Sequence, residues 1–131
     1  MRIVLDSYAI LAYLADEKGA EKVEKYLERA REGSVSLYMS TVNLGEVYYI
    51  LTRRKGVEVA DFVVALLKRE PVKFVAVDER IALLAGRIKA FHKLSYADAF
   101  AVATAVDLNA KLLTGDEEFR SVKEKVEIEW L

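Results

Sequence analysis

Residues 2–15 read RIVLDSYAILAYLA, a strand pattern followed at once by a helical one. Arg2–Asp6 is a short run of β-branched residues and leucine, which is typical of a buried strand. Ser7 is a residue type that often begins helices, so we expect it to be the N-cap of a helix that continues to about Ala15. The chain therefore opens with a strand–helix unit, and Asp6 is the last residue of the strand.

The alternation of strand and helix continues along the rest of the chain. Apolar spacing and capping residues predict helices over Ala20–Arg31, from Ser40 or Thr41 to Arg54, over Glu58–Glu70, from Asp78 to Phe91, and from Ser95 to about Asn109. Short apolar runs predict strands over Val35–Met39, Lys73–Val77, Lys111–Thr114 and Val126–Trp130. Strands that alternate with helices form parallel sheets with helices on both faces. We therefore predict an α/β fold, a three-layer α/β/α sandwich with a central parallel sheet of about five strands.

Length and composition indicate one globular domain over residues 1–131, since the chain is 53% hydrophobic and 31% charged. It contains no cysteine, which excludes disulfides, thiolate metal sites and a cysteine nucleophile. No stretch reaches the roughly 20 apolar residues of a membrane span, so we expect a cytoplasmic protein. The formal net charge of −1 gives no global attraction to nucleic acid, so such a contact would need local clusters.

Four acidic residues fall where predicted strands end or where the following helices begin. Asp6 ends the first strand and Asp116 follows the fourth, whereas Glu46 and Asp98 lie in early turns of helices. In parallel α/β sheets, ligands bind outside the carboxyl ends of the strands. We therefore expect these side chains to converge at that edge, although they are far apart in the sequence.

Converging carboxylates repel one another, by roughly 4 kcal/mol for a pair about 4 Å apart at an effective dielectric of about 20. Such a cluster must bind protons or a cation. Oxygen ligands without thiolate or imidazole select a hard ion, so we expect Mg²⁺ or Mn²⁺, which activates water and holds a phosphate oxygen. The predicted catalytic residues are Asp6, Glu46, Asp98 and Asp116, with Asp6, Asp98 and Asp116 as the metal ligands.

Each acid also has a purely structural interpretation. Residues 95–98 and 43–46 both fit capping boxes, in which the acid satisfies a backbone donor. Asp116 would serve a Gly-Asp turn, and Asp6 an Asx turn at the strand end. The structural interpretation is weakest for Asp6, because an acid after Ile-Val-Leu lies in a partly dry setting. The two interpretations stay open for each acid alone, and the set as a whole favours a site.

The residues around these acids resemble motifs of the PIN domain family. The resemblance lies in Val4-Leu5-Asp6-Ser7-Tyr8-Ala9, Asn43-Leu44-Gly45-Glu46, Ser95-Tyr96-Ala97-Asp98-Ala99 followed by Ala103-Thr104-Ala105, and Leu113-Thr114-Gly115-Asp116 with Glu118-Phe119. These motifs follow the family's order over essentially the whole chain, and they look most like VapC-type toxins. The resemblance implies a Mg²⁺- or Mn²⁺-dependent endoribonuclease that hydrolyses RNA, usually a homodimer, inhibited by a small VapB-like antitoxin. It also implies that Ser7 and Thr114 support the site.

Three further residues are candidate RNA contacts. Arg53 and Arg54 end the helix that carries Glu46, although a basic last turn also complements the helix dipole. His92 is the only histidine and precedes Asp98, where it would contact RNA or simply lie exposed at a helix end.

Two other functions remain alternatives. A PIN-fold module without catalysis would act through a binding partner, although all four carboxylates are present. An aspartate phosphotransfer domain would use the same type of sheet. Haloacid-dehalogenase-type phosphatases of that class need a second acid two residues after the first, and Tyr8 occupies that position.

Overall fold

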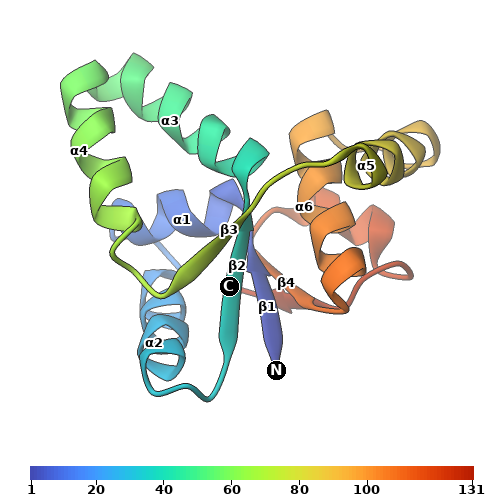
Figure 1. Cartoon of the computed structure of the whole chain (residues 1–131), viewed down its shortest axis with the longest axis horizontal. Helices are drawn as coiled ribbons and strands as arrows, with labels where there is room; N and C mark the ends of the chain where they lie inside the picture. Colours follow the sequence, from blue (N-terminus) through green and yellow to red (C-terminus); the bar gives the residue numbers. More distant parts are fainter.

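The centre of the computed structural model, which describes residues 1–131, is one sheet of five parallel strands (Figure 1). The strands are β1 (Arg2–Leu5), β2 (Ser36–Ser40), β3 (Val72–Val75), β4 (Lys111–Thr114) and β5 (Ile128–Trp130). Their spatial order is β3-β2-β1-β4-β5, so β1 lies between β2 and β4. The order reverses at β1, and the carboxyl ends of β1 and β4 therefore border the crevice where ligands bind in such sheets.

Helices cover both faces of this sheet. They are α1 (Ser7–Leu14), α2 (Ala20–Arg31), α3 (Thr41–Lys55), α4 (Val57–Leu67), α5 (Glu79–Phe91), α6 (Tyr96–Leu108) and the 3₁₀ helix η1 (Glu117–Val122). Helices α1 to α4 lie on one side, and α5 and α6 lie on the other (Figure 1). None of them has the length and apolar character needed to cross a bilayer.

Alternate residues of the central strands point to opposite faces and divide the core into two clusters. Ile3 and Leu5 pack with α1 and α2, whereas Val4 packs with α5 and α6. Strand β4 repeats the pattern, with Leu113 on the first face and Leu112 on the second. A strand covered on both faces needs apolar residues at successive positions, which is why β1 is a continuous Ile-Val-Leu run. The predicted three-layer α/β/α sandwich with five parallel strands is confirmed.

Some predicted boundaries are wrong by a few residues. Asp6, not Ser7, is the N-cap of α1, because β1 already ends at Leu5 and the Asp6 carboxylate accepts a backbone N–H of the first turn. Helix α4 covers Val57–Leu67 instead of 58–70, since the chain tightens into three-residue turns before Pro71.

The strands and one short helix also differ from the prediction. Strand β3 covers Val72–Val75 instead of 73–77, and β5 begins at Ile128 instead of 126. Residues 117–122, for which no element was predicted, form η1 directly after the loop that follows β4. That helix places a further acid at the carboxyl edge of the sheet.

Candidate metal centre

Asp6 lies at the carboxyl end of β1 and is only 1% exposed. Both of its oxygens are hydrogen-bonded, Oδ1 to the Ala9 N–H at 2.8 Å and Oδ2 to the Thr114 hydroxyl at 2.6 Å. Burial raises the pKa of Asp6 to about 7 against the opposing effect of these bonds, and the charges of Asp98 and Asp116 raise it further. A cation bound close by would therefore favour the ionised form of Asp6.

Thr114 connects the acids that follow β1 and β4. Its buried hydroxyl donates to Asp6 and accepts the backbone N–H of Asp116 at 3.0 Å. A hydroxyl has one proton and two lone pairs, so it can make both bonds at once. Asp116 Oδ1 in turn accepts the Glu118 N–H at 2.9 Å and is the N-cap of η1. The loop after β4 is thus held by a chain of bonds that begins at Asp6.

Asp98 comes to the same edge from the first turn of α6. Ser95 is the predicted N-cap of this helix, and its hydroxyl accepts the Asp98 N–H at 3.1 Å. Burial raises the pKa of Asp98 to about 6, the Ser95 hydroxyl opposes that rise, and the charges of Asp116, Glu46 and Glu118 add to it. Asp98 is therefore within electrostatic reach of three other acids.

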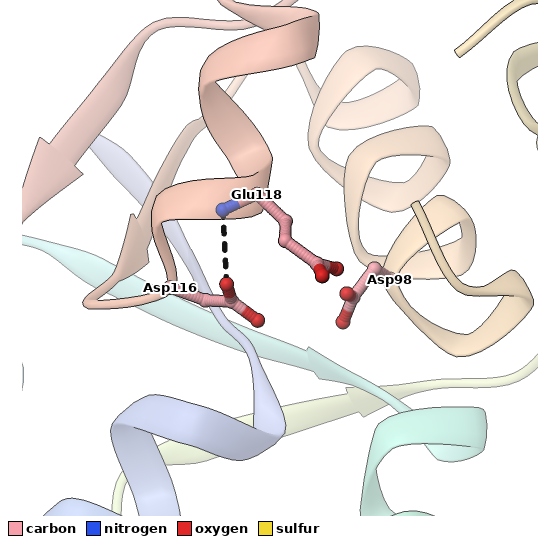
Figure 2. Close-up of side chains that lie close together, drawn as sticks. All are labelled: Asp98, Asp116 and Glu118. Carbon is pink, nitrogen blue, oxygen red and sulfur yellow. Dashed lines mark hydrogen bonds between the residues drawn. The ribbon is translucent and has the colours of Figure 1, made fainter. Parts of the chain in front are cut away.

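Three carboxylates from different elements share one space. Asp98, Asp116 and Glu118 each offer an oxygen, and these oxygens all lie within 4.8 Å of one another (Figure 2). No lysine, arginine or histidine forms an ion pair with any of them. Oxygen donors at this spacing, with no thiolate or imidazole among them, fit a hard divalent cation such as Mg²⁺ or Mn²⁺.

Glu46 borders this space from α3. The Ser7 hydroxyl donates to Glu46 Oε1, so the residue after Asp6 orients the acid of another helix. The capping-box interpretation of Glu46 is wrong, because Ser40 is the N-cap of α3 and accepts the Val42 N–H. The charge of Glu46 contributes to the raised pKa of Asp98, so the two acids lie within electrostatic reach of each other.

Asn43 ties the helix of Glu46 to the helix of Asp98. It is fully buried, and its side-chain amide donates to the Ala97 carbonyl at 3.1 Å. Because Ala97 directly precedes Asp98, this bond fixes the position of the Asp98 backbone relative to α3.

The geometry agrees only in part with the set of metal ligands expected from the sequence. Asp98 and Asp116 belong to the group of three carboxylates, whereas Asp6 does not. The third member of the group is Glu118, which belongs to the closing motif but was not among the ligands expected from the sequence. A signal for it was present, since an aspartate after a strand commonly accepts the N–H two residues later in an Asx turn, and that residue is Glu118.

The candidate RNA contacts lie outside the acid cluster. The Arg53 guanidinium lies over the Tyr49 ring, 5.2 Å from its centroid. Arg54 lines a surface pocket near the start of the chain. His92 Nδ1 is 3.0 Å from the Ser121 carbonyl, which holds the end of α5 against η1.

Comparison with known proteins identifies a family and a shared fold. Residues 3–125 match the model of the PIN domain family. Comparison with curated protein sequences gives no significant match. The structure is similar to VapBC2 from Rickettsia felis bound to a DNA fragment from its promoter, with a TM-score of 0.78 and 13% identity over 100% of this chain and 99% of that chain.

Two other solved structures show the same fold. A toxin–antitoxin complex from Klebsiella pneumoniae has a TM-score of 0.68 and 14% identity, covering 92% of each chain. VapC20 from Mycobacterium tuberculosis, a toxin that cleaves the sarcin–ricin loop, has a TM-score of 0.69 and 20% identity over 92% of this chain and 94% of that chain. At these identities the similarity shows a common fold.

Proposed function

The chain belongs to the PIN domain family, and we propose that it is a Mg²⁺- or Mn²⁺-dependent endoribonuclease, the toxin of a toxin–antitoxin pair. The observation that carries this proposal is the convergence of Asp98, Asp116 and Glu118, whose oxygens suit a divalent cation. RNA as the substrate is supported by the structural likeness to VapC20, a toxin that cleaves the sarcin–ricin loop.

The acids have separable roles in this proposal. Asp98, Asp116 and Glu118 hold the cation, which when bound activates water and neutralises charge on the scissile phosphate. Glu46 Oε1 is occupied by the Ser7 hydroxyl, so we assign Oε2 to accept a proton from the attacking water. Asp6 contributes charge and, through its bond to Thr114, positions the loop of Asp116.

We further propose that an antitoxin and a second copy of the chain bind away from the acids. Apolar side chains are exposed on α3 and α4, with Tyr49 at 47%, Phe62 at 64% and Leu66 at 43%. Exposed apolar side chains on two helices that pack together suit protein–protein contacts. The similarity to VapBC2 and to the Klebsiella pneumoniae toxin–antitoxin complex supports such a partner. Light scattering should give the mass of two chains, and the mass of one would contradict the homodimer.

Cleavage of labelled RNA by the purified chain tests the enzymatic proposal. We expect cutting with Mn²⁺ or Mg²⁺, none in EDTA, and a rate at least about 100-fold lower for Asp98→Asn, since the loss of a ligand should cost no less than the loss of its supporting groups. Asp107→Asn is the matched control, because Asp107 lies on the same helix but pairs with Arg80. Cutting that persists in EDTA, or that Asp98→Asn leaves unchanged, would contradict the proposal. DNA of the same sequence should stay intact.

A further inference from the structure

Tyr8 lies beside the loop that carries Asp116. It follows Ser7, and its ring lies against Gly115, between Thr114 and Asp116 in the sequence. A Cβ at Gly115 would come within 2.4 Å of the ring atom Cε1, so only glycine leaves room for the ring in this position. The side chain is nevertheless 45% exposed. One side of the ring therefore packs against Gly115, and the rest of the ring is open to a ligand.

Two surface pockets meet at Tyr8. The first is also lined by Leu11, Glu17, Lys18 and Arg54, and the second by Lys18, Gly115, Glu117, Arg120 and Trp130. Because the pockets share Tyr8 and Lys18, they adjoin there and pass the loop that carries Asp116. A ligand that follows both pockets would lie next to the acid cluster.

The charges along these pockets favour an anionic ligand. Lys18 and Arg54 form no ion pair, whereas Arg120 is bound by Glu117 and lies over the Trp130 ring, 4.8 Å from its centroid. Glu17 also lines the first pocket and offsets part of the positive charge. Two unpaired cations beside an open aromatic ring provide both phosphate contacts and a stacking surface.

We propose that Tyr8, Lys18 and Arg54 form a subsite for single-stranded RNA next to the cleavage site, an inference that rests on the proposed function. Tyr8 stacks on the base of a nucleotide beside the scissile phosphate, and the two cations bind flanking phosphates. The RNA ligand is single-stranded, because a base in a duplex is already stacked on its neighbours and is not free to stack on a side chain. Arg54 thereby gains a specific role among the basic residues at the end of α3.

Binding of a fluorescein-labelled, unstructured RNA oligonucleotide, measured by anisotropy in Ca²⁺ with gels showing an intact strand, tests the subsite. Tyr8→Leu should raise Kd about tenfold, which corresponds to the loss of one stacked base, and Tyr8→Phe should leave Kd unchanged. Phe91→Leu is the matched control, because Phe91 is an aromatic residue 80% exposed on α5 and lies outside both pockets. Equal binding by wild type and Tyr8→Leu, or an equal loss in Phe91→Leu, would overturn the inference.

Lys18→Gln gives an independent measurement at an exposed position, where folding is not at risk. The variant should make the plot of log binding constant against log salt concentration less steep by about 0.7, the value for one phosphate contact on a single strand. Lys68→Gln, which removes an exposed lysine outside the pockets, should leave the slope unchanged. An unchanged slope in Lys18→Gln would also overturn the subsite.

Failure of the subsite and failure of the proposed function give different results. If the wild-type chain cuts RNA but the Tyr8→Leu variant binds it as tightly as wild type, only the subsite is wrong. If the wild type never cuts RNA with any divalent ion, the proposed function is wrong, whatever the Kd values. If Tyr8→Leu weakens binding of a protein partner but not of RNA, the surface belongs to that partner and the RNA subsite is overturned.

Discussion

The acid cluster has a closed half and an open half. In the closed half, Asp6 is 1% exposed and both its oxygens accept hydrogen bonds, one of them from Thr114. In the open half, Asp98, Asp116 and Glu118 face one another without a cationic side chain. The same chemical group is thus hydrogen-bonded by the fold in one half of the cluster and left without a cationic partner in the other.

From this difference we propose that the closed half has a structural role and that the open half binds the ligand. The Asp6 carboxylate is the N-cap of α1 and, through Thr114, holds the loop after β4. It therefore stabilises the fold whether or not an ion is bound. The open half contributes repulsion without a bound cation and binding energy with one. Changes in the closed half should therefore alter folding, and changes in the open half should alter metal affinity.

The largest expected effect concerns pH and the metal-free protein. The pKa of Asp6 is about 7 in the fold, against an ordinary value of 3.8, so the folded state binds its proton more tightly than the unfolded chain does. The free energy of unfolding should consequently fall as the pH rises from about 4 through about 7, with Asp6 alone accounting for at most about 4 kcal/mol of the fall. Urea unfolding in EDTA, followed by circular dichroism, measures this fall.

Both the Asp6→Asn substitution and added Mg²⁺ should reduce this fall in the free energy of unfolding. In Asp6→Asn the remaining decline should end near pH 6, because Asp98, with a pKa of about 6, is then the main group with a raised value. Mg²⁺ should also restore stability above pH 7, since it binds the ionised carboxylates of the native state only. A free energy of unfolding that is flat or rising between about pH 4 and 7 in EDTA would contradict a buried, protonated Asp6.

Thr114→Val should produce the next largest effect, because it removes the hydroxyl that joins the two halves. The variant keeps the shape of the side chain but leaves Asp6 Oδ2 without a donor. We expect a loss of about 1–3 kcal/mol at pH 8 and less at pH 5, where Asp6 is protonated and does not need the donor as strongly. Chemical unfolding at the two pH values measures the difference.

Thr104→Val is the matched control for that prediction. Thr104 is equally buried, but its hydroxyl donates to the neutral Phe100 carbonyl at 2.8 Å within α6. Its loss should cost about 1 kcal/mol at both pH values. If Thr114→Val shows no more dependence on pH than Thr104→Val, the bond from Thr114 to an ionised Asp6 is not what holds the closed half.

The fold was largely predictable because its signals are local and strong. The Ile-Val-Leu run before Asp6 and the Leu-Leu pair in β4 identify strands covered on both faces. The alternation of such strands with helices then leaves few arrangements, and the observed sheet is one of them. The convergence of Asp98 with Asp116 followed from the same topology, before any side-chain position was known.

The parts that sequence missed depend on contacts that are not local. Asp6 and Ser7 are both good N-cap residues, and the choice of Asp6 accompanies its bond to Thr114, which lies 108 positions away. Glu118 was not predicted as a ligand, because η1 is a short 3₁₀ helix without an apolar period and the sequence did not indicate where its side chains lie. The capping box considered at residues 43–46 is absent, because α3 begins at Thr41 with Ser40 as its N-cap, which is where the helix prediction itself placed the start.

Calorimetric titration of the purified chain with Mn²⁺ tests the central claim, that three converging carboxylates form a site for a divalent cation. The wild type should bind Mn²⁺, Glu118→Gln should bind at least about tenfold more weakly, and Glu117→Gln should match the wild type. Glu117 is the appropriate comparison, because it is the adjacent acid on η1 but pairs with Arg120. Equal affinities for Glu118→Gln and Glu117→Gln, or no binding by the wild type, would contradict the account.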